Sequence, residues 1–243
     1  MRLAPPQNAA LDRTARAFEH SRMQLLTPAD FAVAAVPPAL GDDEIHLWFF
    51  PHWQKLRAAT DAPMVRTLLG AYLDIAPQTL RFERGEHGKP RLADTALEFN
   101  LSHAGTALLL GVSRRTALGV DLEPAQRRTR ALTELAQRWF MPREAQALAA
   151  QPEAAQQAAF LRLWTCKEAV LKCSGAGIGT GLARLEFELS AQAQVLGVRA
   201  DAGWQLLALE PDPAHLGALA WRGQPLRVRG FVTQAIAATA QSG

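Results

Sequence analysis

One long helical segment among many short β-rich segments constrains the fold most strongly. Pro152 is followed by a run with no further proline or glycine up to Cys173. Proline is favoured in the first turn of a helix, and glycine just beyond its end. Four glycines then follow at alternate positions, Gly175, Gly177, Gly179 and Gly181. The sequence therefore predicts a helix from Pro152 to about Cys173.

Short apolar and β-branched runs, separated by glycine and proline, lie on both sides of this helix and predict strands. Further helices are expected after Pro63 and from Pro142. The strands before the long helix are expected at residues 45–50, 80–82, 97–101, 107–112 and 117–122, and those after it at 185–189, 195–198, 205–209, 218–221 and 226–232. Each half thus combines helix with antiparallel sheet, which predicts an α+β fold.

The size and composition exclude several classes of protein. The chain has 243 residues, 49% of them hydrophobic, which is enough for a sizeable core. Cys166 and Cys173 are the only cysteines and offer neither a disulfide framework nor a CxxC metal site. No apolar run approaches the length of a membrane span, and the start lacks the pattern of a secretory signal. A cytoplasmic protein without a membrane partner is expected.

The charge balance gives little support for nucleic-acid binding. The excess of 26 Lys+Arg over 23 Asp+Glu leaves a net charge of only +3, which is weak for a protein that follows a phosphate backbone. The positive charge is uneven, however. Five arginines lie on either side of the acidic segment described next: Arg114, Arg115, Arg127, Arg128 and Arg130. An acidic protein partner and a merely solvated basic face both remain open.

The segment GVDLEP, residues 119–124, places two carboxylates on one face of a strand. Asp121 and Glu123 are two positions apart, and alternate side chains of a strand project to the same side. Carboxylates in this arrangement suit Mg²⁺, which takes one or two carboxylates together with substrate phosphates. Alternating acidic residues on an exposed strand give the same pattern.

The long helix carries Glu168 and Lys172 one turn apart, with Trp164 one turn earlier. Such a pair is often only a surface ion pair worth a few tenths of a kcal/mol. The large aromatic residue on the same side indicates instead that this face is partly buried. The spacing therefore permits a site without requiring one.

A third group of polar residues lies where a strand meets a loop. Lys89 stands between Gly88 and Pro90, and the segment FNLSHAG, residues 99–105, contains Ser102 and His103. Lysine supplies a point charge for phosphate, and Ser and His supply hydrogen-bond donors. The group is typical of a site for an anionic ligand, although a Ser-His pair in a turn is also an ordinary structural feature.

Three other chemistries do not match the sequence. Ser102 and His103 are neighbours on a strand, point to opposite faces and lack a GxSxG elbow, which disfavours a hydrolase. The glycine run after the long helix lacks the GK[ST] of a phosphate-binding loop, and it follows a helix where a Rossmann fingerprint follows a strand. Cys166 and Cys173 are expected to be packing residues.

Taken together and in order, these motifs resemble one family. The succession GKP, FNLSHAG, GVDLEP and W-x-x-KEA-x-x-K is similar to that of the phosphopantetheinyl transferases of the larger, two-lobed, surfactin-synthetase-activating type. The segment RTLLG from Arg66 resembles the family's coenzyme-binding arginine segment. The resemblance covers roughly Arg66 to Leu182.

The resemblance implies a fold, a substrate and a set of site residues. The fold would be a pseudo-dimer of two similar α+β lobes with coenzyme A in the cleft, and a chain of this length would be a monomer. Asp121, Glu123 and Glu168 would hold Mg²⁺, with Mn²⁺ as an alternative. Coenzyme A would contact the residues Arg66, Lys89, Pro90, Ser102, His103, Asp121 and Lys172.

The implied reaction moves the phosphopantetheine arm of coenzyme A to a serine of an acidic apo carrier protein and releases adenosine 3′,5′-bisphosphate. Glu168 would accept the serine proton, directly or through a bound water, and Lys172 would stabilise or protonate the leaving group. A catalytically silent coenzyme A-binding module and a module that only docks carrier proteins remain as alternatives. The carboxylate trio favours the enzyme.

The chain is expected to divide into an extension at residues 1–43, a coenzyme-binding lobe at 44–114 and a metal-binding catalytic lobe at 115–243. One departure from the family lies between Phe50 and Arg66, where the sequence is shorter and less basic than the pattern. Lys55 and Arg57 are the basic residues that could substitute there. The nucleotide end of the coenzyme would therefore be covered less completely.

Overall fold

The computed structural model has an α+β architecture, as the sequence predicts. No helix among the described residues is long and apolar enough to cross a membrane. The structure describes residues 23–53, 58–85, 88–127, 132–176, 181–199 and 201–233. Lys55, Arg57, Arg128, Arg130, Gly177 and Gly179 lie outside this described part.

The first of the two main sheets has five strands in the order β2-β13-β3-β7-β6. Strand β13 pairs in parallel with both β2 and β3, whereas β3, β7 and β6 pair antiparallel. The sheet is therefore mixed. Its strands are β2 (Phe31–Val33), β13 (Arg227–Val232), β3 (Glu44–Phe50), β7 (Ala107–Ser113) and β6 (Glu98–Ala104).

The second sheet has four strands in the order β1-β11-β12-β8, and only β1 is parallel to its neighbour. Its strands are β1 (Gln24–Leu26), β11 (Trp204–Asp212), β12 (His215–Arg222) and β8 (Leu118–Pro124). Two small antiparallel pairs complete the β-structure, β4 (Phe82–Arg84) with β5 (Pro90–Leu92) and β9 (Phe187–Leu189) with β10 (Val195–Val198).

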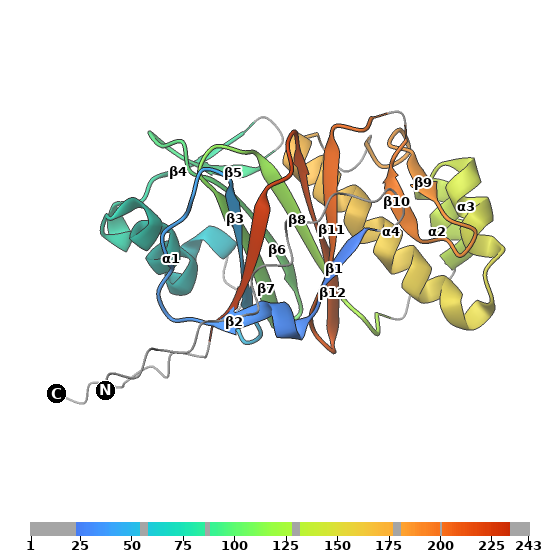
Figure 1. Ribbon diagram of the computed structural model, residues 1–243, viewed down its shortest axis with the longest axis horizontal. Coiled ribbons are helices and arrows are strands. Elements are labelled where there is room, and N and C mark those ends of the chain that lie inside the picture. The colour runs from blue at the N-terminus through green and yellow to red at the C-terminus, as the bar shows by residue number, and fades with distance from the viewer. Residues whose placement is uncertain are drawn as a thin grey trace, which may run out of the picture.

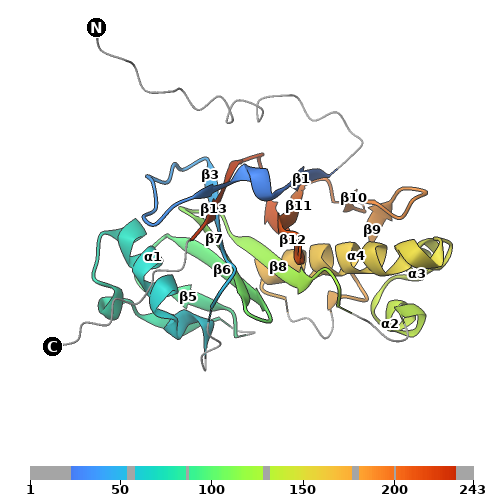
Figure 2. The ribbon, with the colours of Figure 1, turned by 90° about the horizontal axis from the view of Figure 1, so that it is seen from below.

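Helices cover the outer faces of the sheets. Helix α1 (Pro63–Leu73) lies against the first sheet, and α4 (Glu153–Ser174) crosses the second, on opposite sides of the molecule (Figure 1, Figure 2). Helices α2 (Leu132–Trp139) and α3 (Pro142–Ala149) pack beside α4, and short 3₁₀ turns occupy Pro28–Asp30, Ala59–Asp61 and Pro77–Thr79. Each lobe thus combines one sheet with a helix across its outer face.

Strand periodicity divides the core into layers. On β3, Ile45, Leu47 and Phe49 lie between the two sheets, and Trp48 and Phe50 pack under α1. Side chains of successive strand residues point to opposite faces, so one apolar strand contributes to both layers. A third apolar cluster lies between the second sheet and α2, α3 and α4. The order of layers is α1, first sheet, second sheet, α4.

The helix boundaries follow the proline and glycine pattern. Pro142 is the first residue of α3, and Pro152 directly precedes α4. Helix α4 ends at Ser174, where Gly175 takes a φ of 71°, a left-handed conformation that glycine adopts at little cost. The long helix was therefore predicted to within one residue at each end.

The segment 1–43 was expected to lie outside the core. Residues 23–43 instead form part of both sheets. Strand β1 pairs with β11, and β2 pairs with β13, so this segment contributes an edge strand to each sheet. Leu26 and Phe31 are buried between the sheets. Each of these strands has only three residues, too few for alternation to be recognised. Residues 1–22 lie outside the described part.

The strand pairing also departs from the expected boundary at residues 114 and 115. Strand β13 follows the entire second sheet in sequence, yet it lies in the first sheet between β2 and β3. A contact between segments this distant is not visible in local sequence. We therefore describe the lobes by their sheets, with β13 in the first lobe.

Candidate active site

Strand β8 presents Asp121 and Glu123 to helix α4. Alternate residues of β8 fill the core between the sheets, which leaves the two carboxylates on the opposite face. Gly119 makes this close packing possible. A Cβ at position 119 would lie 2.0 Å from the carbonyl oxygen of Ala169 and 2.4 Å from the amide nitrogen of Cys173.

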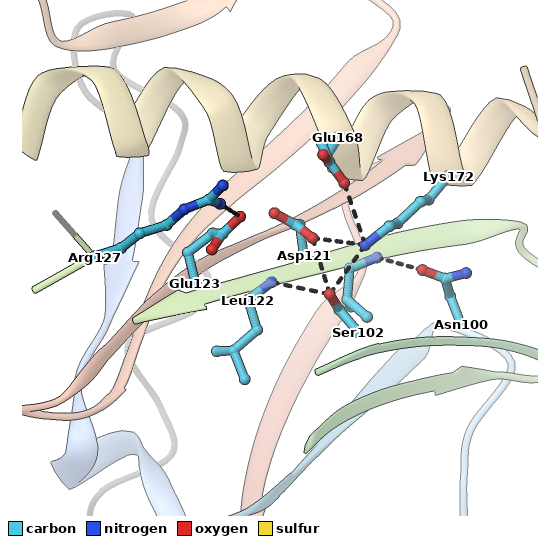
Figure 3. A network of polar contacts seen from close by, with 9 residues as sticks. Asn100, Ser102, Asp121, Leu122, Glu123, Arg127, Glu168 and Lys172 are labelled. Atoms are coloured by element: carbon cyan, nitrogen blue, oxygen red, sulfur yellow. Dashed lines mark hydrogen bonds and ion pairs between the residues drawn. The ribbon is translucent and has the colours of Figure 1, made fainter. Parts of the chain in front are cut away.

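Helix α4 brings Glu168 and Lys172 onto this acidic face (Figure 3). Lys172 Nζ lies 2.6 Å from Asp121 Oδ1 and 3.6 Å from Glu168 Oε2. It also lies 3.0 Å from Ser102 Oγ, which comes from β6 of the first lobe. The structure thus brings together residues separated by up to 70 positions in the sequence.

Ser102 connects the two lobes through its hydroxyl group. The hydroxyl donates to Asp121 Oδ1 at 2.9 Å and accepts from the amide of Leu122 at 3.3 Å and from Lys172. Ser102 is buried, in agreement with these three contacts. The side chain therefore fixes the orientation of Asp121.

Negative charge exceeds positive charge in this cluster. Three carboxylates, Asp121, Glu123 and Glu168, face Lys172 and Arg127, and Arg127 Nη1 pairs with Glu123 Oε1 at 2.5 Å. Burial, followed by the charge of Asp121, raises the pKa of Glu168 to about 7, against the opposing effect of Lys172. Burial and Asp121 also raise the pKa of Glu123, with Arg127 opposing.

The carboxylate oxygens of this cluster are of the kind that binds a hard cation, although in the described structure they do not converge on one point. Within the described residues, no three His, Cys, Asp or Glu side chains lie close enough together to hold a metal ion as they stand. Lys172 is the cation that lies against Asp121 and Glu168 here. Asp121 Oδ2 is nevertheless buried without a hydrogen-bond partner in the described structure. Carboxylate oxygens in excess, one of them unpartnered, are suitable ligands for Mg²⁺.

Lys89 and Pro90 lie beside a hollow between the lobes. This hollow of about 170 Å³ is lined by residues of β5, β6 and their loops and by Gly175 at the end of α4. Lys89 Nζ donates to the carbonyl oxygen of Leu118 at 3.1 Å, and burial lowers the pKa of Lys89. An ammonium group next to an interlobe hollow is well placed to meet an anionic ligand.

His103 does not share the environment of Ser102. It is exposed, and its ring lies 5.4 Å from the ring of Trp53 on the other face of β6. None of the hydrogen bonds or ion pairs of the Lys172 cluster involves His103 in the described structure. The geometry agrees with the argument against a Ser-His hydrolase.

Arg66 is held by the backbone of its own lobe. Its guanidinium donates to the carbonyl oxygens of Pro77 at 3.1 Å and Leu80 at 2.8 Å, and it lies 5.1 Å from the centre of the Phe82 ring. These contacts tie α1 to the segment that leads into β4. They show a structural role for Arg66, and its contact with a coenzyme stays a prediction.

Asn100 was not predicted as a site residue. It is buried on β6, and its side-chain oxygen accepts from the amide of Val120 at 2.8 Å (Figure 3). Its position two residues before Ser102 places both side chains on the same face of the strand. That polar alternation was the available indication, but the strand edge that Asn100 meets is not evident from sequence.

The two cysteines are both buried and free. Burial raises the pKa of Cys166 to about 12 and that of Cys173 to about 11. A thiol that stays protonated at neutral pH is a poor nucleophile. Their prediction as packing residues agrees with this burial.

Known proteins are similar to this chain over much of its length. The family model described as the 4′-phosphopantetheinyl transferase superfamily matches residues 117–217, which include both β8 and α4. The chain is 36% identical over 191 residues to the 4′-phosphopantetheinyl transferase HetI of Nostoc sp., a match that covers 76% of this chain and 79% of that protein.

Two further relatives come from Bacillus. The 4′-phosphopantetheinyl transferase psf-1 of Bacillus pumilus is 33% identical over 58% of this chain and 62% of its own length. The 4′-phosphopantetheinyl transferase Sfp of Bacillus subtilis is 28% identical over 54% of this chain and 58% of its own. The chain therefore belongs to the 4′-phosphopantetheinyl transferase superfamily, enzymes that transfer the phosphopantetheine arm of coenzyme A to carrier proteins.

Proposed function

We propose that the acidic face between β8 and α4 is the catalytic site of this transferase and that the hollow beside Lys89 receives coenzyme A. The observation that carries the proposal is the surplus of carboxylates around Lys172, directly between the two lobes. A pyrophosphate substrate needs cations on its oxygens and a base near its serine acceptor. The cluster has the groups for both tasks.

Asp121, Glu123 and Glu168 would hold the metal ion, with Mg²⁺ as first choice and Mn²⁺ as the alternative. The ion would act as a Lewis acid that offsets charge on the pyrophosphate oxygens. Asp121 Oδ2, buried without a hydrogen-bond partner among the described residues, supports this assignment. So do the raised pKa values of Glu123 and Glu168, which result from burial first and from the charge of Asp121 second.

Glu168 would be the general base. The serine oxygen of the carrier forms a bond to the phosphorus that bears the pantetheine arm, and the bond from that phosphorus to the bridging oxygen breaks. The serine proton passes to Glu168, and adenosine 3′,5′-bisphosphate leaves. A base works best with a pKa near the working pH, and in the metal-free protein burial, followed by the charge of Asp121, raises the pKa of Glu168 to about 7.

Lys172 would stabilise the leaving phosphate. Its ammonium already lies among acidic oxygens, with Asp121 Oδ1 at 2.6 Å. In the reaction, Lys172 would turn from these carboxylate oxygens toward the negative charge that develops on the leaving phosphate. Lysine suits that task because its three donors rotate freely.

The remaining contacts with coenzyme A would come from the first lobe. Lys89 and Pro90 border the hollow, and Ser102 donates a hydrogen bond to the carboxylate of Asp121. Contacts of His103 and Arg66 with the coenzyme are part of the proposal. The exposure of His103 on the strand that carries Ser102 supports the former.

The carrier protein would be an acidic acyl, peptidyl or aryl carrier domain. Partly exposed Arg114 and Arg127 support this choice. Arg127 also forms an ion pair with Glu123, and Arg114 also donates a hydrogen bond to the carbonyl oxygen of Leu40. A cytoplasmic monomer is part of the same proposal. The two unpaired, buried cysteines agree with a reducing compartment.

Intact-mass spectrometry of a panel of apo carrier proteins tests the proposal. Each carrier is incubated with this protein, coenzyme A and Mg²⁺, and a parallel sample contains EDTA. A gain of one phosphopantetheine arm that requires the metal is the expected result. Coenzyme A binding without any gain on any carrier would show a silent binding module instead.

A further inference from the structure

Strand β8 is an edge strand of its sheet. It pairs with β12 on one side only, so the backbone groups of Leu118, Val120 and Leu122 point away from the sheet toward β6. Backbone groups buried in this position need hydrogen-bond partners. Strands β6 and β8 lie side by side without pairing into one sheet.

Three polar side chains of the first lobe supply these partners, and we call them the seam. Lys89 Nζ donates to the carbonyl oxygen of Leu118 at 3.1 Å. The amide of Val120 donates to Asn100 Oδ1 at 2.8 Å, and the amide of Leu122 donates to Ser102 Oγ at 3.3 Å. The seam therefore replaces a neighbouring strand at every second residue of β8.

We propose that Asn100 is a positioning residue for Asp121, an inference that rests on the proposed function. Asp121 lies between the two amides that the seam holds, those of Val120 and Leu122. Of the seam residues, Ser102 also contacts Lys172 and Asp121, and Lys89 borders the hollow. Asn100 Oδ1 contacts only the Val120 amide among the described residues.

This division of tasks explains why a buried asparagine stands at position 100. Lys89 and Ser102 are the groups that a bound coenzyme would engage. A contact with the coenzyme would weaken the hydrogen bond that each of them makes to the backbone of β8. Asn100, only 4% exposed, keeps the edge of β8 in place while the coenzyme binds. A displacement of about 1 Å at a catalytic group lowers a rate on the order of 100-fold.

Two substitutions of equal shape separate the hydrogen bond from the packing. Asn100→Leu removes the acceptor, and Asn100→Asp keeps it. In the transfer assay, Asn100→Leu should lower kcat at least about 10-fold and change KM for coenzyme A less than about 3-fold. Asn100→Asp should retain kcat within about 3-fold. Hydrogen exchange of the Val120 amide should be faster in Asn100→Leu alone.

Tyr72→Phe is the matched control for a lost buried hydrogen bond. The Tyr72 hydroxyl contacts His46 Nδ1 at 2.7 Å and accepts from Trp48 Nε1 at 2.8 Å, under α1 and away from the seam. This variant should melt at a lower temperature and keep its kcat. Loss of kcat in Tyr72→Phe equal to that in Asn100→Leu would show that Asn100 acts only through stability.

Two further outcomes would overturn the inference. One is an unchanged kcat in Asn100→Leu, and the other is an equal loss in Asn100→Leu and Asn100→Asp. If the unaltered protein modifies no carrier, the proposed function fails. The positioning role of Asn100 is then tested by the rise in melting temperature that Mg²⁺ induces. The rise should be lost in Asn100→Leu and kept in Asn100→Asp. Its absence from the unaltered protein, or its survival in Asn100→Leu, would refute the positioning role.

Discussion

Helix α4 carries two lysines in acidic surroundings, and they differ in how the charge is balanced. Lys167 is fully buried and faces α3, where its Nζ lies 2.8 Å from Glu144 Oε2. Lys172 faces β8 and is 22% exposed, with Asp121 and Glu168 beside it. One helix therefore provides a direct comparison of two ion clusters.

Every polar group of the Lys167 cluster has a partner. Lys167 Nζ donates to Glu144 and to the carbonyl oxygens of Leu182 and Leu185. Glu144 accepts in addition from the amides of Met141, at 2.8 Å, and Phe187, at 2.6 Å. One positive and one negative charge cancel, which makes this cluster a scaffold that joins α3, α4 and β9.

The Lys172 cluster lacks this balance. Among the described residues it has three carboxylates for two cations, and Asp121 Oδ2 is without a hydrogen-bond partner. Burial, followed by the charge of Asp121, raises the pKa of Glu168 to about 7. Perturbed ionisation of this kind occurs preferentially at functional sites. Buried charge alone therefore does not indicate a functional site. Uncompensated charge between two lobes does.

A large loss of transfer activity should follow from Asp121→Asn. This change removes a negative charge from the unbalanced cluster and keeps the size of the side chain. Transfer should fall on the order of 100- to 1000-fold, because a metal ion contributes several kcal/mol of charge stabilisation. The rate of mass gain on an apo carrier measures the loss. Turnover near that of the unaltered protein would remove Asp121 from the site.

The balanced cluster should respond in stability. Lys167→Met leaves Glu144 charged and buried, which should lower the free energy of unfolding by about 3–5 kcal/mol. Urea denaturation measures it. The double variant with Glu144→Gln should recover part of the loss, since it removes the unpaired buried charge and keeps one of the two acceptor oxygens that the backbone amides use. A Lys167→Met variant of normal stability would show that the buried pair is not a scaffold.

The unbalanced cluster should make metal-free stability depend on pH. The folded pKa of Glu168, about 7, lies above its ordinary value of 4.5, so the folded protein binds more protons between these values. Stability should therefore fall by a few kcal/mol at most as the pH rises from about 5 to about 8. Melting curves in EDTA test this, and Glu168→Gln should flatten the dependence. An equally steep dependence in that variant would assign it to another group.

The smallest effect is expected for Arg127→Gln. Arg127 pairs with Glu123 at 2.5 Å but is 48% exposed. Exposed pairs contribute about 0–1 kcal/mol, so the melting temperature should change by a few degrees at most. A larger loss would mean that Arg127 balances the acidic cluster more strongly than its exposure indicates.

The arrangement of the acidic groups was largely predictable because it depends on local periodicity. Alternation on a strand placed Asp121 and Glu123 on one face, and helical spacing placed Glu168 and Lys172 on one side. The structure brings these groups together as expected. The ordered motifs also predicted the family, and the comparisons with known proteins confirm it.

The lobe boundaries and the seam were not predictable because they depend on distant contacts. Strand β13 crosses into the first sheet, and the three-residue strands β1 and β2 pair in different sheets. Asn100 gains its partner only when the edges of β6 and β8 meet. Nothing in the local sequence encodes which edge a polar side chain will meet.

The most direct test of the account is the transfer rate of Glu168→Gln under saturating coenzyme A and Mg²⁺. Its dissociation constant for coenzyme A is measured in parallel. Because a positioned base contributes on the order of 100- to 10000-fold, the mass gain of the carrier should slow by that factor. Coenzyme A should still bind within about 10-fold, because Glu168 is not proposed to hold the coenzyme. Near-normal transfer by Glu168→Gln would contradict the claim that the unbalanced cluster performs the reaction.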